Sequence, residues 1–173
     1  MKRIIIMATV TLIILGAALL GVFKIIESIV QTPPANNPRA FTMQGGPKGN
    51  RVLVCIGDSI THGTVSASYA DMLAARLADR NISVVNAGIN SELAYNALQR
   101  LDEIAACDPD YLTVLIGTNH AEGALSARTA RHLTAEMKLP QEPTLAWFRS
   151  NLMALCTRLR ERTRAKIALM SLP

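Results

Sequence analysis

A serine, a glycine and an asparagine, each placed just after a short apolar run, are the residues of this sequence best suited to chemistry. They are Ser59, Gly88 and Asn119. The runs before them read as buried strands, and the carboxyl ends of parallel strands lie along one edge of a sheet, so we expect the three residues to converge. A serine hydroxyl can attack a carbonyl carbon, while a backbone N–H and a side-chain amide can hold the resulting oxyanion. This set indicates acyl transfer.

The serine also has a simpler interpretation. Asp58, Ser59 and Thr61 are residue types that cap the start of a helix, and a helical pattern follows Gly63. The position favours the functional interpretation, because the tip of a buried strand just before a helix is where α/β sheets place their chemistry. The first amides of that helix and its dipole would favour developing negative charge.

Three blocks in this order resemble the GDSL/SGNH hydrolase family of esterases and lipases. The first block appears as GDSIT at residues 57–61, and the glycine of the second as the last residue of NAG at 86–88. The third block, usually Gly-x-Asn-Asp, appears as GTNH at 117–120. Each block follows a predicted strand, and the resemblance runs from about residue 52 to residue 173.

The resemblance implies a role for each of these residues. Ser59 would be the nucleophile, and the amides of Ser59 and Gly88 and the side chain of Asn119 would be the oxyanion donors. The family uses no metal or organic cofactor. It would act on an acyl ester of a small molecule, a lipid or a carbohydrate.

The resemblance also implies a catalytic base that this sequence does not supply. The family's base and acid come from a later Asp-x-x-His block, and that pattern does not occur here. Of the histidines present, we expect His120 to shape the pocket, His62 to be solvated or to cap a turn, and His132 to lie on the surface. We therefore expect a fragment of a longer hydrolase. A non-catalytic or degenerate domain on the same scaffold is the alternative.

The elements that must position these residues alternate between strand and helix patterns. Apolar runs predict strands, and apolar stripes at helical spacing predict helices. The strands are expected at 52–56, 82–85, 111–116 and 165–170, and the helices around 70–80, 93–104, 130–137 and 145–159. The alternation predicts an α/β fold, a doubly wound parallel sheet. The resemblance makes it flavodoxin-like and incomplete at the C-terminus, with the fourth strand left as an exposed edge.

The first 30 residues predict a transmembrane helix that anchors the protein in the cell membrane. No charged residue occurs between Ile4 and Phe23, and a helix of that length spans a hydrocarbon core of ~30 Å. Lys2 and Arg3 precede the span, so we expect a single pass with the hydrolase domain on the extracytoplasmic side. A cleaved signal peptide is the alternative. Residues 31–50, with their Pro, Asn and Gly, predict a linker, and residues 51–173 the hydrolase domain.

Composition argues against other classes of function. The net charge is +5, but aromatic residues make up only 4% and do not interleave with basic ones, so we expect no nucleic-acid partner. The three cysteines match no metal-binding spacing, and we expect Cys55 and Cys156 to be buried thiols.

No Gly-x-Gly-x-x-Gly or Gly-Lys-Ser/Thr follows the first strand, which disfavours a nucleotide site. Four arginines alternate from 158 to 164; we expect a solvated helix surface, with a membrane-facing patch as the alternative.

Overall fold

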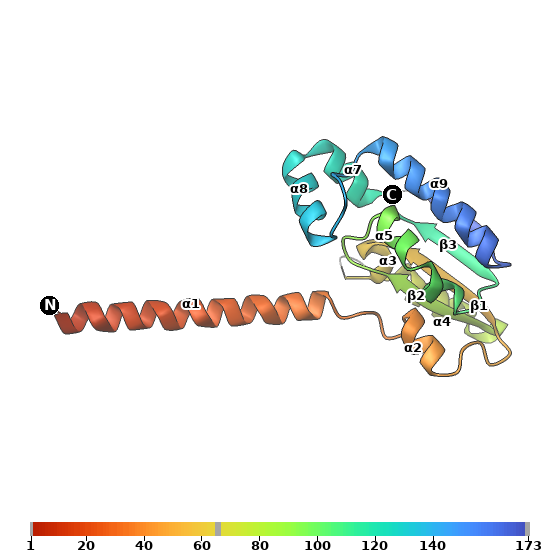
Figure 1. The fold of residues 1–173 in the computed structure, drawn as a ribbon. Coiled ribbons are helices and arrows are strands. Elements are labelled where there is room, and N and C mark those ends of the chain that lie inside the picture. The colour runs from red at the N-terminus through yellow and green to blue at the C-terminus, as the bar shows by residue number, and fades with distance from the viewer. Residues whose placement is uncertain (1, 65–66, 172–173) are drawn as a thin grey trace. The chain divides into compact units, whose positions relative to one another are not determined.

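The computed structural model describes residues 2–64 and 67–171, without the side chains of 2–10, 27 and 29. It separates the chain into two units, Met1–Thr32 and Pro33–Pro173. The first unit contains one helix, α1 (Lys2–Val30) (Figure 1). Among the described residues, no helix combines the length and the apolar character that crossing a membrane requires. The predicted transmembrane anchor is therefore not confirmed and stays a prediction, and part of it falls on side chains outside the description.

The second unit is built on a parallel sheet of four strands. The strands are β1 (Arg51–Gly57), β2 (Ile82–Gly88), β3 (Tyr111–Leu115) and β4 (Lys166–Leu169). Their order across the sheet is β2-β1-β3-β4, and every pair is parallel. All four predicted strands are confirmed. The central strand β1 is buried from its second residue to its last, as an apolar run covered on both faces requires.

Helices cover both faces of this sheet because alternate residues of β1 point to opposite sides. On one side, Val54 and Ile56 pack in a core that includes Leu155 and Leu159. On the other side, Cys55 packs with Ala70 and its neighbours. The first layer is made by α2 (Pro38–Met43), α5 (Ala94–Gln99), α6 (Leu101–Ala105) and α9 (Leu145–Arg162). The second is made by α4 (Tyr69–Leu77), which is followed by a 3₁₀ turn (Ala78–Arg80) (Figure 1). The predicted α/β class with a parallel sheet is confirmed.

The remaining helices follow β1 and β3 along the chain. They are α3 (Ser59–His62), α7 (Thr118–Leu125) and α8 (Ala127–Glu136). Of these, only α8 falls in a predicted helix. The helix predicted around 93–104 is divided into α5 and α6 at Arg100, whose backbone leaves the helical region with φ −112° and ψ 27°. The Arg100 side chain makes a buried contact, described below.

Most of the segment predicted as a linker is ordered and belongs to the second unit. Asn37 caps α2 with its side chain, and Pro38 occupies the first turn of that helix. Phe41 packs against the core. Asn36 bonds to β2 twice, with its carbonyl accepting from the Asn86 N–H at 3.0 Å and its Nδ2 donating to the Val84 carbonyl at 3.2 Å. The segment thus covers the outer edge of β2, where unpaired strand groups would otherwise be exposed.

Candidate active site

Ser59 stands at the start of α3, directly after β1. Asp58 is the N-cap of this helix, and its Oδ1 accepts a hydrogen bond from the Ile60 N–H at 3.1 Å. Gly63 ends the helix in the left-handed region with φ 93°, a conformation that glycine adopts without strain. Capping is therefore done by Asp58. The half-buried Ser59 is left at the first turn, where helical amides have no partner within the helix.

The helix α3 lies tightly against the ends of two strands, and glycine makes this approach possible. A Cβ on Gly57 would lie 2.1 Å from Thr61 Oγ1 and 2.3 Å from the Leu115 carbonyl oxygen. A Cβ on Gly88 would lie 2.3 Å from the His62 nitrogen. Neither position tolerates a side chain unless the backbone moves.

The register of the sheet brings the three predicted residues to one edge. Gly57 of β1 pairs with Gly88 on one side and with Leu115 of β3 on the other. Ser59 follows Gly57 by two residues, and Asn119 follows Leu115 by four, in the first turn of α7. The ends of β1, β2 and β3 therefore present Ser59, Gly88 and Asn119 at the same edge of the sheet.

The Gly88 amide is engaged within the protein. It donates to Asn86 Oδ1 at 3.0 Å, and Asn86 Nδ2 donates to the Thr61 carbonyl at 2.9 Å. Asn86 is fully buried, and sequence reasoning treated it only as part of a motif. Its signal was an asparagine two residues before a glycine, a pair that often forms a side-chain-to-backbone turn. An oxyanion would have to share the Gly88 N–H with Asn86.

The Asn119 side chain is held by a neighbouring loop. Its Nδ2 donates to the backbone carbonyl of Glu92 at 3.0 Å. A carboxamide NH₂ group carries two hydrogens, so this bond orients the group and leaves a second N–H for a ligand. Asn119 is half-buried, which keeps that N–H in reach of a bound molecule.

A buried ion pair that sequence reasoning missed lies beside these residues. Glu92 is only 1% exposed, and Arg100 binds it with two nitrogens, Nε to Oε1 at 2.6 Å and Nη2 to Oε2 at 2.6 Å. The same Nη2 also donates to the Ala87 carbonyl. Burial raises the pKa of the Glu92 carboxyl group, and the Arg100 guanidinium opposes that shift. No local pattern identified the pair, because charged residues at the start of a predicted helix or within it are normally solvated.

The cap Asp58 is itself in an unusual setting. Its side chain is 1% exposed, and within the described part of the chain Oδ2 has no hydrogen-bond partner. Burial raises the pKa of Asp58, while the hydrogen bond from the Ile60 amide lowers it. Such a carboxyl beside a nucleophile position is typical of a functional site, although structural caps show the same trait.

The sequence of most of this chain is similar to a known family of proteins. Residues 55–173 match the GDSL-like lipase/acylhydrolase family. The chain belongs to this family. A catalytic mutant of the acetylxylan esterase from Geobacillus stearothermophilus is similar in structure, with a TM-score of 0.56 and 21% identity. A Parabacteroides merdae protein described as a GDSL-like lipase gives 0.52 and 23%.

The structural matches cover only part of each chain. Each structural match covers 69% of this chain and 58% of the solved one, so the chain spans little more than half the length of those relatives. At such identities the likeness concerns the fold. No curated protein sequence matches the chain. Membership in the GDSL-like family supports a hydrolase, and the roles of the individual residues remain predictions.

The three histidines of this GDSL-like chain have other contacts. His62 Nδ1 lies 2.6 Å from Thr64 Oγ1, and the exposed His132 lies 3.4 Å from a Glu136 carboxylate oxygen. His120 is fully buried, and burial lowers its pKa to about 4. Its ring lies 4.7 Å from Phe148, between ring centroids, and neither ring nitrogen has a hydrogen-bond partner among the described residues. None of these contacts makes a histidine the base for Ser59.

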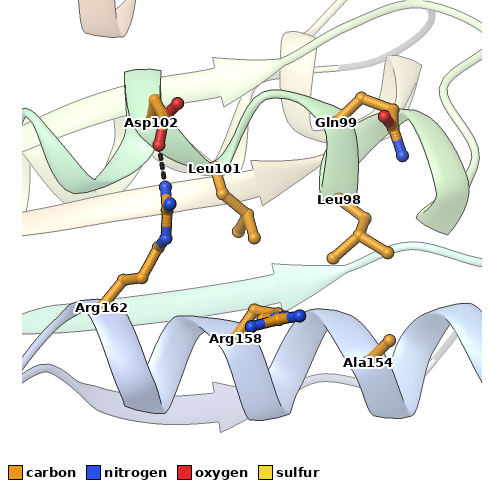
Figure 2. Close-up of a pocket in the computed structure, with 7 residues that line it drawn as sticks. All are labelled: Leu98, Gln99, Leu101, Asp102, Ala154, Arg158 and Arg162. Atoms are coloured by element: carbon orange, nitrogen blue, oxygen red, sulfur yellow. Dashed lines mark ion pairs between the residues drawn. The ribbon is translucent and has the colours of Figure 1, made fainter.

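A pocket of about 520 Å³ lies elsewhere, between α9 and the α5–α6 segment (Figure 2). Arg162 reaches across it to pair with Asp102, and Arg158 pairs with Glu161. The residues that line it are Leu98, Gln99, Leu101, Asp102, Ala154, Arg158 and Arg162. The predicted catalytic residues are not among them, and the arginines form part of an exposed helix surface.

Residues able to bind a metal do not gather in the part of the chain described here. There, no group of three His, Cys, Asp or Glu side chains could hold a metal ion. The expected burial is confirmed for Cys55, and Cys107 is also buried, but the expectation is wrong for Cys156, which is only half-buried.

Proposed function

We propose that this chain carries the nucleophile and the oxyanion donors of an acyl ester hydrolase. Ser59 Oγ attacks the carbonyl carbon of the ester, the alcohol leaves, and water then releases the acid from the acyl-enzyme. The observation that supports this best is the pairing of Gly57 with both Gly88 and Leu115, since it gathers the ends of three strands at one edge.

The donors would act on the negative charge that develops on the carbonyl oxygen. The second N–H of Asn119 is oriented by its bond to the Glu92 carbonyl, and the Ser59 amide lies at the start of α3. Preorganised donors of this kind stabilise the transition state more than the bound substrate, and the loss of one typically lowers kcat by about 100- to 1,000-fold.

The proton of Ser59 needs an acceptor, because a neutral serine is a weak nucleophile. The family resemblance implies that a histidine of a later Asp-x-x-His block, oriented by a carboxylate, would accept this proton. Hydrolysis is therefore expected of a protein that includes such a block. Acetylated xylo-oligosaccharides are the first substrates to test, because acetylxylan esterases are among the similar structures.

A non-catalytic domain on the same scaffold is the second candidate, favoured by the burial of His120 against Phe148 and by the exposed pairing of His132 with Glu136. A fluorophosphonate probe separates the two, because it labels only an activated serine. Time-dependent labelling of the protein that is lost in Ser59→Ala would support the hydrolase. Absence of labelling in a protein that carries a downstream Asp-x-x-His block would favour the binding domain.

The location of the domain stays a proposal from the sequence of residues 1–30. We propose that this segment anchors the protein in the cell membrane, with the hydrolase domain on the extracytoplasmic side. Membrane fractionation of the full chain and of a chain beginning at Pro33 tests this. Recovery of both proteins in the soluble fraction would contradict it.

A further inference from the structure

The ion pair between Glu92 and Arg100 is unusual because it is buried beside a proposed catalytic edge and not on the surface. Glu92 is 1% exposed, and the side chain of Arg100 is 13% exposed. Two N–H···O contacts of 2.6 Å fix the guanidinium against the carboxylate. Burying both charges is expensive, and an apolar pair of similar volume would stabilise the fold as well or better. The pair therefore calls for a reason beyond stability.

The first link from the pair runs to the end of β2. Arg100 Nη2 donates to the carbonyl of Ala87. That carbonyl belongs to the same planar peptide unit as the Gly88 N–H. The guanidinium therefore fixes the orientation of the peptide whose N–H the family resemblance assigns to the oxyanion.

The second link runs to the start of α7. The backbone carbonyl of Glu92 accepts the hydrogen bond from Asn119 Nδ2 at 3.0 Å. The Glu92 side chain is clamped by Arg100, and Arg100 is in turn held by the Ala87 carbonyl, so the Glu92 carbonyl is fixed relative to β2. Through these contacts, one side-chain pair holds both the Ala87–Gly88 peptide and the Asn119 side chain in place.

We propose that the Glu92–Arg100 pair is a positioning device that sets the Asn119 carboxamide and the Ala87–Gly88 peptide for oxyanion binding. This role rests on the hydrolase function proposed above. Neither residue touches the substrate. Arg100 lies at the junction of α5 and α6, and from there its side chain reaches both Glu92 and Ala87.

Arg100→Lys is the most informative change, because lysine keeps the charge but loses the planar fork that binds the carboxylate and the carbonyl together. Glu92→Gln, which keeps the shape and removes the charge, is the second variant if the first does not fold. Asp102→Asn is the matched control, because it breaks the exposed pair with Arg162 only two residues from Arg100 (Figure 2).

The deciding measurement is the NMR spectrum of the 173-residue chain, which requires no activity. We expect Arg100→Lys to shift the side-chain amide signals of Asn119 and the backbone amide signal of Gly88, and Asp102→Asn to leave both in place. Folded Arg100→Lys and Glu92→Gln proteins with both signals unmoved would overturn the proposal.

The second test is to measure kcat and KM in a protein that hydrolyses p-nitrophenyl acetate. We expect Arg100→Lys to lower kcat by about 10- to 100-fold with little change in KM, as a small misplacement of a catalytic donor does. In an Asn119→Ala background the same substitution should have less effect, because only the part that acts through the Ala87–Gly88 peptide remains. Fully additive losses would overturn the proposal. If Ser59→Ala retains activity, the hydrolase function fails instead, while shifted NMR signals would still show the positioning contacts.

Discussion

Gly88 lies opposite Gly57 in the parallel register of β1 and β2, and neither position has room for a side chain. Both glycines let α3 rest on the strand ends, and α3 begins with Ser59. The local shape of the site therefore depends on two residues that carry no functional group.

Gly88→Ala should distort this contact. Its Cβ would lie within 2.3 Å of the His62 nitrogen, and backbone atoms cannot move aside as a flexible side chain can. We expect the free energy of unfolding to fall by about 1–3 kcal/mol, as overpacking a buried site does. Urea denaturation measures this. Ile89→Ala, at the neighbouring exposed position, is the control, and equal losses for the two variants would contradict the explanation.

His120 should make stability depend on pH. Its pKa is lowered from 6.5 to about 4 by burial, so the folded protein binds its proton only below pH 4 and the unfolded chain already below pH 6.5. The contribution to stability is complete above pH 6.5 and is lost as the pH falls from 6.5 to 4. The loss is at most about 3 kcal/mol.

His120→Phe removes this dependence and also removes two ring nitrogens that have no hydrogen-bond partner among the described residues. We expect the variant to match or exceed the wild-type stability at pH 7 and to lose less between pH 6.5 and 4. The stability of the variant must be compared with that of wild type at each pH, because the raised pKa of Asp58 changes stability at low pH in the opposite direction in both proteins. His132→Asn, at an exposed position, is the control. Parallel pH curves for wild type and His120→Phe would contradict the assignment.

The strands and their polar ends could be predicted because parallel strands are covered on both faces. Such burial demands continuous apolar runs, so β1 was recognisable from its sequence, and the residues after each run were necessarily at one edge. Gly88 and Asn119 could be predicted for the same reason, because each comes just after an apolar run. Such signals are local and can be recognised in a single sequence.

The parts that escaped prediction depend on contacts between distant residues. Glu92 lies just before a helical pattern and Arg100 lies within it, and nothing local says that the two charged side chains meet in the interior. The ring of His120 enters the core because Trp147 and Phe148 of α9 surround it. The Asn36 segment looked like a linker because its order comes from hydrogen bonds to β2, and its only local signal was the short cap at Asn37 and Pro38.

Asn119→Ala tests the proposed oxyanion role directly. In a protein that supplies the catalytic base, we expect kcat to fall by about 100- to 1,000-fold while KM changes little, because the contact forms mainly in the transition state. Steady-state hydrolysis of p-nitrophenyl acetate measures both constants. Ser59→Ala sets the background rate. An increase in KM with unchanged kcat would instead mean that Asn119 only binds the substrate.

The order in residues 33–50 predicts that a domain cut at the sequence-based boundary is damaged. A chain beginning at Arg51 lacks the hydrogen bonds that Asn36 makes to β2 and lacks Phe41, which packs against the core. Exposing that strand edge also favours pairing with other chains. We expect a lower urea midpoint and more aggregation than for a chain beginning at Pro33, the first residue of the second unit.

Phe41→Ala in the longer chain should reproduce part of the loss in the free energy of unfolding, about 1–3 kcal/mol for a half-buried aromatic ring. Equal stability of the two truncated chains would show that the segment rests on the domain without stabilising it.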